Sequence, residues 1–312
     1  MKHAPKHSLL EVSEDEMEKV RKFYGIDENA ILQDMEIIEE WGKKQEHLVE
    51  AMKYLHREIL ERIYLIAKGS VEATKNIIEK LFTIRGMMSE LTLNKSIGEF
   101  NKLLENIKFV VMPKLTEEQS RVIVIQFATG KWDDFNFLTF VRYYFMLADY
   151  RLHFDYNLSE TFIVDLKNLS INDITKLNPM TIKKGEILSL SCYGVKINSI
   201  HIVNAPSFVD TLITILKQAL RENLVGRLHV HSTYEDLHKA TPKDIIPENY
   251  GGNSLSVEKL SELWQECFTS EEARQIVENT NKLVSDESKR SSFKFNEEYL
   301  GMPGSFKKLA VD

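Results

Sequence analysis

Three histidines in the second half of the chain are the first candidates for chemistry. His229 and His231 are two residues apart in an apolar run, so in a strand both side chains would lie on one face. His201 lies in a neighbouring apolar run, and three imidazoles can bind zinc. However, no carboxylate or cysteine completes a ligand set by spacing. The sequence therefore favours structural histidines, and we expect no metal site.

Asp165, Cys192 and Cys267 are the other residues with reactive side chains in suggestive positions. Asp165 directly follows an apolar run and is a candidate general base, and the two cysteines have no CxxC partner. None of the patterns GxGxxG, GxxxxGK[ST], GxSxG and HExxH occurs. We expect no enzyme activity and no cofactor. An enzyme that lacks a signature motif, such as a hydrolase, stays open as an alternative.

Composition limits the classes of function. The 312 residues are 43% hydrophobic and 28% charged, which is ordinary for a globular protein. The net charge of −7 argues against nucleic acid, because such binding depends on neutralising phosphates. Residues 1–50 hold 13 acids and 7 bases, so a basic patch must lie further along the chain. Two cysteines, and no apolar run of signal-peptide or membrane-spanning length, lead us to expect a cytoplasmic protein.

The elements that must position these residues change type along the chain. Apolar residues recur at three- and four-residue spacing from Glu14 to about Arg85, which predicts packed helices. A less ordered connection is expected over residues 87–105. Short apolar runs then alternate with helical segments, and this order predicts an α/β fold with a mainly parallel sheet. The strands are expected at 122–127, 162–166, 199–203 and 228–230, and the helices at 135–154, 181–192 and 208–221.

Three stretches of sequence resemble a known family. They are FIVDLKNLS at 162–170, IHIVNAPSFVDTLITILKQAL at 200–220 and RLHVHSTYEDLHKATPKDIIPENYGG at 227–252. These stretches are similar to the CRAL-TRIO lipid-binding domain of tocopherol-transfer and retinaldehyde-binding proteins. In that family Asp165 corresponds to a carboxylate that anchors a loop, and the histidine runs occupy structural positions.

The resemblance implies an α/β architecture with an N-terminal helical bundle, an apolar pocket and a mobile helix that opens it. The expected domains are a helical bundle at 1–95, a CRAL-TRIO domain at 96–268, and a C-terminal helix and tail at 269–312. The last twenty residues are similar to the tail of the insect branch. The implied function is binding and transfer of a tocopherol-, retinoid- or carotenoid-like lipid.

Residues 208–221 are the expected gate helix of this pocket. Their apolar positions cover much more than the stripe of about 100° that packing on a sheet requires. A broader apolar surface suits a helix that covers a cavity and also touches a membrane. An ordinary covering helix is the alternative. The expected hinge is Asn204-Ala205-Pro206, because proline fixes the exit of the chain from the strand.

The resemblance and strand alternation together predict which residues line the pocket. They are Met146, Phe162, Val164, Ile171, Leu177, Leu188, Tyr193, Ile200, Ile202, Phe208, Leu212, Ile215 and Leu216. Solid core packing is the alternative for each of them.

Four basic residues are predicted to contact a membrane or a phosphoinositide headgroup: Lys196, Lys217, Arg221 and Arg227. Other basic positions of the family hold Leu65, Ala67, Asn198 and Asn223, so the match is partial. The expected partners are a hydrophobic small molecule or lipid and, transiently, a membrane surface, without nucleic acid. A phosphoinositide-binding or exchange protein and a lipid-independent interaction module remain the alternatives.

Overall fold

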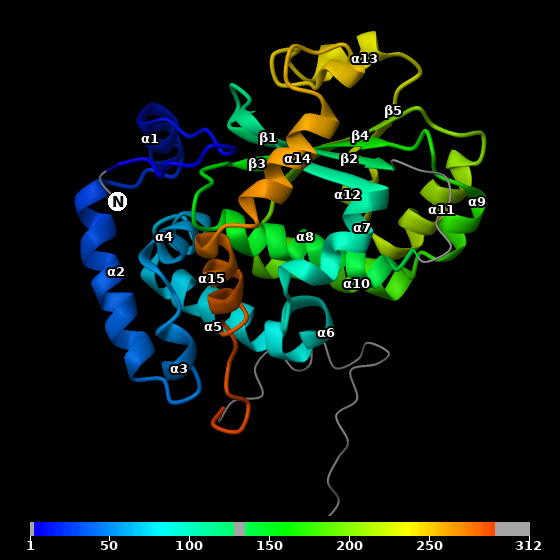
Figure 1. The fold of residues 1–312 in the computed structure, drawn as a ribbon. Coiled ribbons are helices and arrows are strands. Elements are labelled where there is room, and N and C mark those ends of the chain that lie inside the picture. The colour runs from blue at the N-terminus through cyan, green and yellow to red at the C-terminus, as the bar shows by residue number, and fades with distance from the viewer. Residues whose placement is uncertain (1–2, 128–134, 291–312) are drawn as a thin grey trace, which may run out of the picture.

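A five-stranded sheet forms the centre of the computed structural model, which describes residues 3–127 and 135–290 (Figure 1). The strands follow one another across the sheet in chain order, from β1 to β5. Their bounds are β1 Ile107–Leu115, β2 Ser120–Phe127, β3 Ser159–Asp165, β4 Ile197–Val203 and β5 Leu228–Val230. β1 and β2 form an antiparallel hairpin, and all later neighbours are parallel. The expectation of a mainly parallel α/β sheet is confirmed.

Helices make up the N-terminal part, as predicted. They are α1 Glu14–Phe23, α2 Glu28–Lys43, α3 Val49–Met52, α4 Arg57–Ile66 and α5 Val71–Met87. Ser13 and Ser70 cap α1 and α5 by accepting hydrogen bonds from the N–H groups of the first turn. Short elements fill the expected irregular connection: α6 Ser89–Thr92, η1 Ile97–Phe100 and α7 Asn101–Asn106.

The remaining helices connect and cover the strands. They are α8 Phe137–Arg151, α9 Ile171–Thr175, α10 Pro179–Ile187, η2 Leu188–Cys192, α11 Val209–Ala219, α12 Glu222–Val225, α13 Tyr234–Ala240, η3 Glu248–Tyr250, α14 Val257–Cys267 and α15 Glu271–Thr280. In Figure 1 the sheet crosses the upper half, α8 and α10 lie below it with α5 to their left, and α6 lies lower still. No helix among residues 3–127 and 135–290 is long and apolar enough to cross a membrane.

A buried ionic network joins the N-terminal helices to α8. The Asp149 carboxylate accepts hydrogen bonds from Arg85 Nη1 at 2.7 Å, Lys95 Nζ at 2.9 Å and the Tyr193 hydroxyl at 2.7 Å. Arg85 also donates to the Thr280 carbonyl at 2.6 Å, which attaches the end of α15. Burial lowers the pKa of Lys95 to about 8. Removing one member of such a group costs about 3–5 kcal/mol, so the network fixes the helices relative to one another.

Strand β1 is the main element that the sequence patterns missed. Pro113 interrupts the apolar run, and the pairing with β2 shifts register between Val111 and Leu115. Proline is tolerated there because β1 lies at the edge of the sheet. On its outer side the backbone has no neighbouring strand, in the part of the chain that the structure describes, to which an N–H group must donate. The domain boundaries expected at residues 95 and 268 stay predictions. The tail expected to resemble that of the insect branch lies outside the described residues.

Candidate functional site

A cavity of about 310 Å³ lies between the sheet and the helices that cover one of its faces. Its floor consists of alternate residues of adjacent strands, held in register across the sheet. Phe162 of β3 pairs with Ile200 of β4, and Val164 pairs with Ile202. Ile125 extends the floor on β2. The side chains share a face because residues two apart in a strand point the same way.

The walls of the cavity are formed by helices and the segments between them. Apolar side chains come from α8 to α12 and their connections: Phe135, Phe137, Phe140, Leu166, Leu169, Ile174, Leu177, Ile182, Leu190, Leu212, Leu216, Leu220 and Leu224. Leu212, Leu216 and Leu220 belong to α11 and its C-cap, where four-residue spacing puts them on one side of the helix. One face of α11 therefore closes the cavity.

Three of the polar side chains in the lining have partners within the protein. Asp173 accepts a hydrogen bond from the Ser170 hydroxyl at 2.6 Å in the capping box of α9. Glu186 pairs with Lys183 Nζ at 2.6 Å. The Tyr144 hydroxyl donates to Glu160 at 3.5 Å, and burial raises the pKa of Tyr144. Because these groups are already satisfied, the interior offers mainly hydrocarbon contacts to a ligand.

Asp165 anchors the chain beside the entry to α11. One of its carboxylate oxygens accepts hydrogen bonds from Lys167 N–H and from Asn204 Nδ2, each at 2.9 Å. The other oxygen accepts from the Tyr250 hydroxyl at 3.1 Å. Asn204 has a positive φ of 51°, which few residues other than glycine adopt. Asp165 thus holds the turn between β4 and Pro206 in place.

Residues 105–252 match the family described as the CRAL/TRIO domain. The chain contains a CRAL/TRIO domain. Its sheet, its covering helices and the cavity between them all fall largely within this matched range.

Curated relatives match this chain over a limited length. The mouse alpha-tocopherol transfer protein-like protein is 28% identical over 100 residues, which is 32% of this chain and 29% of the relative. Clavesin-1 from Xenopus laevis is 26% identical over 91 residues, covering 29% of this chain and 27% of the relative. Human clavesin-2 is 25% identical over 91 residues, covering 29% and 28%. The matches thus span under a third of the length of these relatives.

Among solved structures, the crystal structure of Sfh5 is similar to this chain with a TM-score of 0.43 and 14% identity. The similarity covers 84% of this chain and 100% of that one.

The structure brings together seven of the thirteen residues that were expected to line the pocket of the CRAL/TRIO domain. They are Phe162, Val164, Leu177, Ile200, Ile202, Leu212 and Leu216. Phe208 and Ile215 lie outside the lining but pack in the apolar cluster around it.

The other four expected lining residues point elsewhere. Met146 packs in the core between α8 and the sheet, and Leu188 packs against the N-terminal helices. Tyr193 donates its hydroxyl hydrogen to Asp149 in the ionic network. Ile171 is 51% exposed on α9. The direction in which each side chain projects from its segment determines whether it reaches the cavity. The family resemblance does not predict that direction.

Several lining residues were not expected from the sequence. Phe135, Phe137 and Phe140 contribute aromatic walls, and Glu186 contributes a buried charge. Three phenylalanines within six residues, FNFLTF, are a signal that could have been used. Nothing in the sequence marks Glu186, whose place depends on the packing of α10 against α11.

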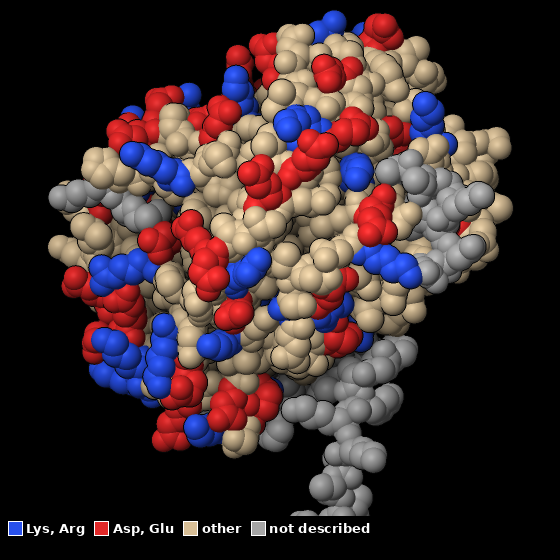
Figure 2. Space-filling view, in the orientation of Figure 1, with Lys and Arg blue, Asp and Glu red and all other residues tan. Residues whose placement is uncertain are grey.

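The four expected basic residues do not form one cluster of contacts. Lys217 is exposed on α11, and the Arg221 side chain donates to Ser191 Oγ at 3.3 Å beside Glu186. Arg227 donates to the carbonyl of Ile197. Lys196 donates to the Tyr24 hydroxyl at 3.2 Å, near the N-terminal helices. Acidic and basic side chains are also interspersed over the face in Figure 2.

A second pocket, of about 90 Å³, lies between α4, the end of α8 and the start of β3. Arg62, Arg151 and Lys196 line it together with Asp155 and Glu160. Arg62 is 6% exposed, and no nitrogen of its guanidinium has a hydrogen-bond partner among the described residues. Burial lowers the pKa of Arg62 to about 10.

The histidines singled out in the sequence lie on the opposite face of the sheet from the cavity. His201 and His229 pair across β4 and β5 with stacked rings 5.5 Å apart. His201 Nδ1 lies 2.8 Å from His231 Nε2, and His201 Nε2 lies 2.8 Å from Ser199 Oγ. Burial lowers the pKa of His201 to about 4. The His201 ring is therefore hydrogen-bonded to His231 and to Ser199, and it stacks on the ring of His229.

Proposed function

We propose that this protein binds a small hydrophobic molecule, of the tocopherol, retinoid or carotenoid kind, and transfers it between membranes. The observation that carries the proposal is the cavity of about 310 Å³, whose polar groups are largely engaged within the protein. This volume lies at the lower end of the range of about 300–1,000 Å³ for small-molecule sites. The relatives named for alpha-tocopherol transfer are consistent with a ligand of this class.

Apolar burial alone is large enough to hold such a ligand. Each Å² of apolar surface removed from water contributes about 25 cal/mol. A few hundred Å² then contributes on the order of 5–10 kcal/mol before the cost of ordering the ligand. Binding therefore requires no covalent step. The proposed contacts are the seven lining residues that the sequence anticipated, with Phe135, Phe137 and Phe140 added.

Release requires a wall of the cavity to move, and α11 is the proposed gate. Leu212 and Leu216 cover the cavity, while Val209 and Ile213 are only partly buried. A helix that exposes part of its apolar surface can exchange protein contacts for a membrane interface. Lys217 lies on its exposed side, where it would meet anionic headgroups.

Extraction and mass spectrometry of the purified protein test this proposal. The protein is incubated with a total lipid extract, separated from free lipid, and extracted with organic solvent. We expect close to one hydrophobic molecule per chain. A protein that stays empty would reject the carrier function and favour the interaction module. Hydrolysis products of ester lipids in the extract would instead indicate a hydrolase.

Binding of a phosphoinositide headgroup is a second candidate function, because of Arg62. A buried guanidinium without hydrogen-bond partners is costly, and phosphate oxygens are strong partners for it. Lys196 lies on the same pocket and extends the positive charge to the surface. Asp155 and Glu160 oppose an anion there, although both already pair with Arg151.

Flotation with phosphoinositide-containing vesicles tests the second function. We expect binding that weakens with added salt, competition by a soluble inositol phosphate, and a clear loss in Lys196→Glu. Lys44→Glu is the matched control, because Lys44 is an exposed lysine that lines neither pocket. Equal binding to vesicles with and without phosphoinositide would reject headgroup recognition while leaving the carrier function untouched.

A further inference from the structure

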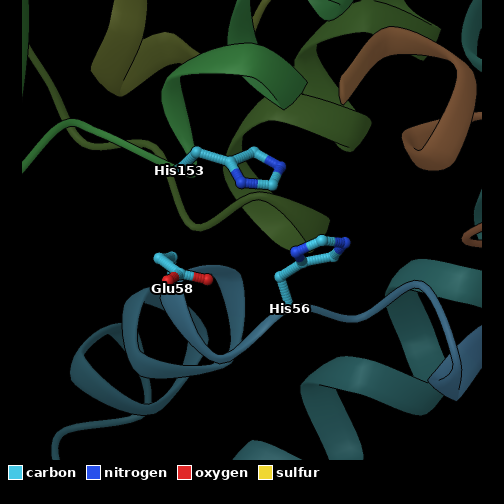
Figure 3. A group of neighbouring side chains, drawn as sticks. All are labelled: His56, Glu58 and His153. Atoms are coloured by element: carbon cyan, nitrogen blue, oxygen red, sulfur yellow. The ribbon is translucent and has the colours of Figure 1, made fainter. Parts of the chain in front are cut away.

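Three potential metal ligands from distant parts of the sequence meet beside the N-terminal helices (Figure 3). His56 is the N-cap of α4 and Glu58 lies in the first turn of that helix. His153 follows the end of α8, 95 residues further along the chain than Glu58. One ligand atom from each residue lies within 4.8 Å of the others. In Figure 3 the His56 ring extends up toward the ring of His153, and Glu58 lies below His153 with its carboxylate directed sideways.

His153 is held in position but lacks polar partners. It is 7% exposed, and its Nε2 atom has no hydrogen-bond partner among the described residues. The backbone on either side is fixed: Arg151 forms an ion pair with Asp155 at 2.9 Å, and Phe154 packs against His7. A buried, unpaired imidazole is costly unless a ligand or water satisfies it. Of the other two members of the group, His56 is exposed and Glu58 is half-buried.

We infer that His56, Glu58 and His153 bind a divalent transition-metal ion of the zinc type. Two imidazoles and one carboxylate form a set that binds Zn²⁺ with a fourth position left for water. Hard ions such as Mg²⁺ prefer oxygen ligands and are not expected here. The site would join the start of α4 to the end of α8. It does not depend on the ligand proposed for the apolar cavity.

The geometry requires a modest closure on binding. Zinc ligands at about 2.0–2.2 Å from the ion lie roughly 3.3 Å from one another in a tetrahedral site. The present separations of up to 4.8 Å exceed this. The exposed His56 and half-buried Glu58 side chains are free to make the adjustment, while the buried His153 acts as the fixed ligand.

Electrostatics makes Glu58 the critical anion of the site. The positive end of α4 opposes a cation at His56, because unpaired N–H groups gather at a helix N-terminus. The Glu58 carboxylate offsets this repulsion and neutralises part of the metal charge. Replacing Glu58 by glutamine should therefore weaken metal binding, although the side chain keeps its size and an oxygen atom.

Titration of the metal-free full-length protein with Zn²⁺ in a calorimeter tests the inference, with Co²⁺ absorption as a report on the ligands. We expect one Zn²⁺ per chain, a Co²⁺ spectrum of low coordination number, and no heat with Mg²⁺. His56→Ala and Glu58→Gln should each weaken Zn²⁺ binding at least about tenfold. Because His56 is exposed and Glu58→Gln keeps the size of the half-buried side chain, circular dichroism should show an unchanged fold.

His229→Ala is the matched control, since it removes an exposed histidine from the other histidine group. We expect it to bind Zn²⁺ as the unmodified chain does. Loss of binding in His229→Ala with retention in His56→Ala would overturn the inference and assign the ion to the sheet histidines. The absence of stoichiometric Zn²⁺ binding in the unmodified chain would also overturn it.

Discussion

The Glu186 carboxylate accepts a hydrogen bond from the backbone N–H of Arg221, with 2.7 Å between Oε1 and N. Glu186 lies on α10 and lines the apolar cavity, while Arg221 follows the C-terminal end of α11. The second carboxylate oxygen pairs with Lys183 Nζ at 2.6 Å. One buried charge thus connects the wall of the cavity to the end of the proposed gate helix.

Weakening this connection should make α11 open more easily. In Glu186→Gln the acceptor loses its charge, and a hydrogen bond to a charged group is worth about 1 kcal/mol more than a neutral one. We expect ligand transfer to vesicles to become about fivefold faster, measured with a fluorescent hydrophobic ligand. Glu222→Gln is the control, because Glu222 is exposed on the neighbouring α12. Equal rates in both variants would show that Glu186 does not restrain the gate.

A charge inside the cavity should prevent hydrophobic binding. Leu212 is 8% exposed and faces the cavity from α11, so Leu212→Asp would bury an unpaired carboxylate there. We expect ligand binding to be abolished in a fluorescence titration. Ile171→Asp should bind normally, because Ile171 is 51% exposed and outside the lining. If Leu212→Asp bound as well as Ile171→Asp, the cavity would not be the binding site.

Charge reversal on the outer side of α11 should affect transfer without affecting binding. Lys217 is exposed and does not line the cavity. Lys217→Glu should slow transfer from anionic vesicles several-fold at low salt, since each lysine near such a surface contributes about 1 kcal/mol. The affinity for ligand in solution should stay the same. Lys44→Glu makes the same charge change beyond the end of α2, on the other side of the molecule, and should transfer normally (Figure 1).

Stability should fall as the pH drops from 6.5 toward 4. Burial lowers the pKa of His7, His153 and His201 to about 4 in the folded chain. Their pKa in the unfolded chain is about 6.5, so the unfolded chain binds more protons in this window. The free energy of unfolding is therefore greatest above pH 6.5 and is progressively lost on acidification.

Urea unfolding at pH 7 and pH 5 measures this loss. His201→Gln should show a smaller decrease between the two values than the unmodified chain, because one titrating group is removed. His3→Gln removes a surface histidine and should keep the full decrease. An identical decrease in all three proteins would mean that His201 does not contribute.

Local patterns were enough to predict much of the fold. The β-branched runs at β2, β3 and β4 and the broad apolar surface of α11 appear in the sequence with the right spacing. Strand β1 was not predicted because Pro113 and a register shift interrupt its apolar pattern. An edge strand tolerates both interruptions. Strand alternation also predicted that Phe162 shares a face with Val164 and Ile200 with Ile202, because that periodicity is a property of the backbone.

Contacts between residues far apart in the chain were decided only by the tertiary structure. The sequence determined the α/β class, the apolar floor of the sheet and the helix that covers it, because each depends on periodicity within one segment. It did not reveal that Glu186 meets Arg221, that Tyr193 joins Asp149, or that His56 and Glu58 face His153. Those pairs depend on how helices are rotated and packed against one another. No spacing along the chain encodes that rotation, since it is set by the close packing of the whole core.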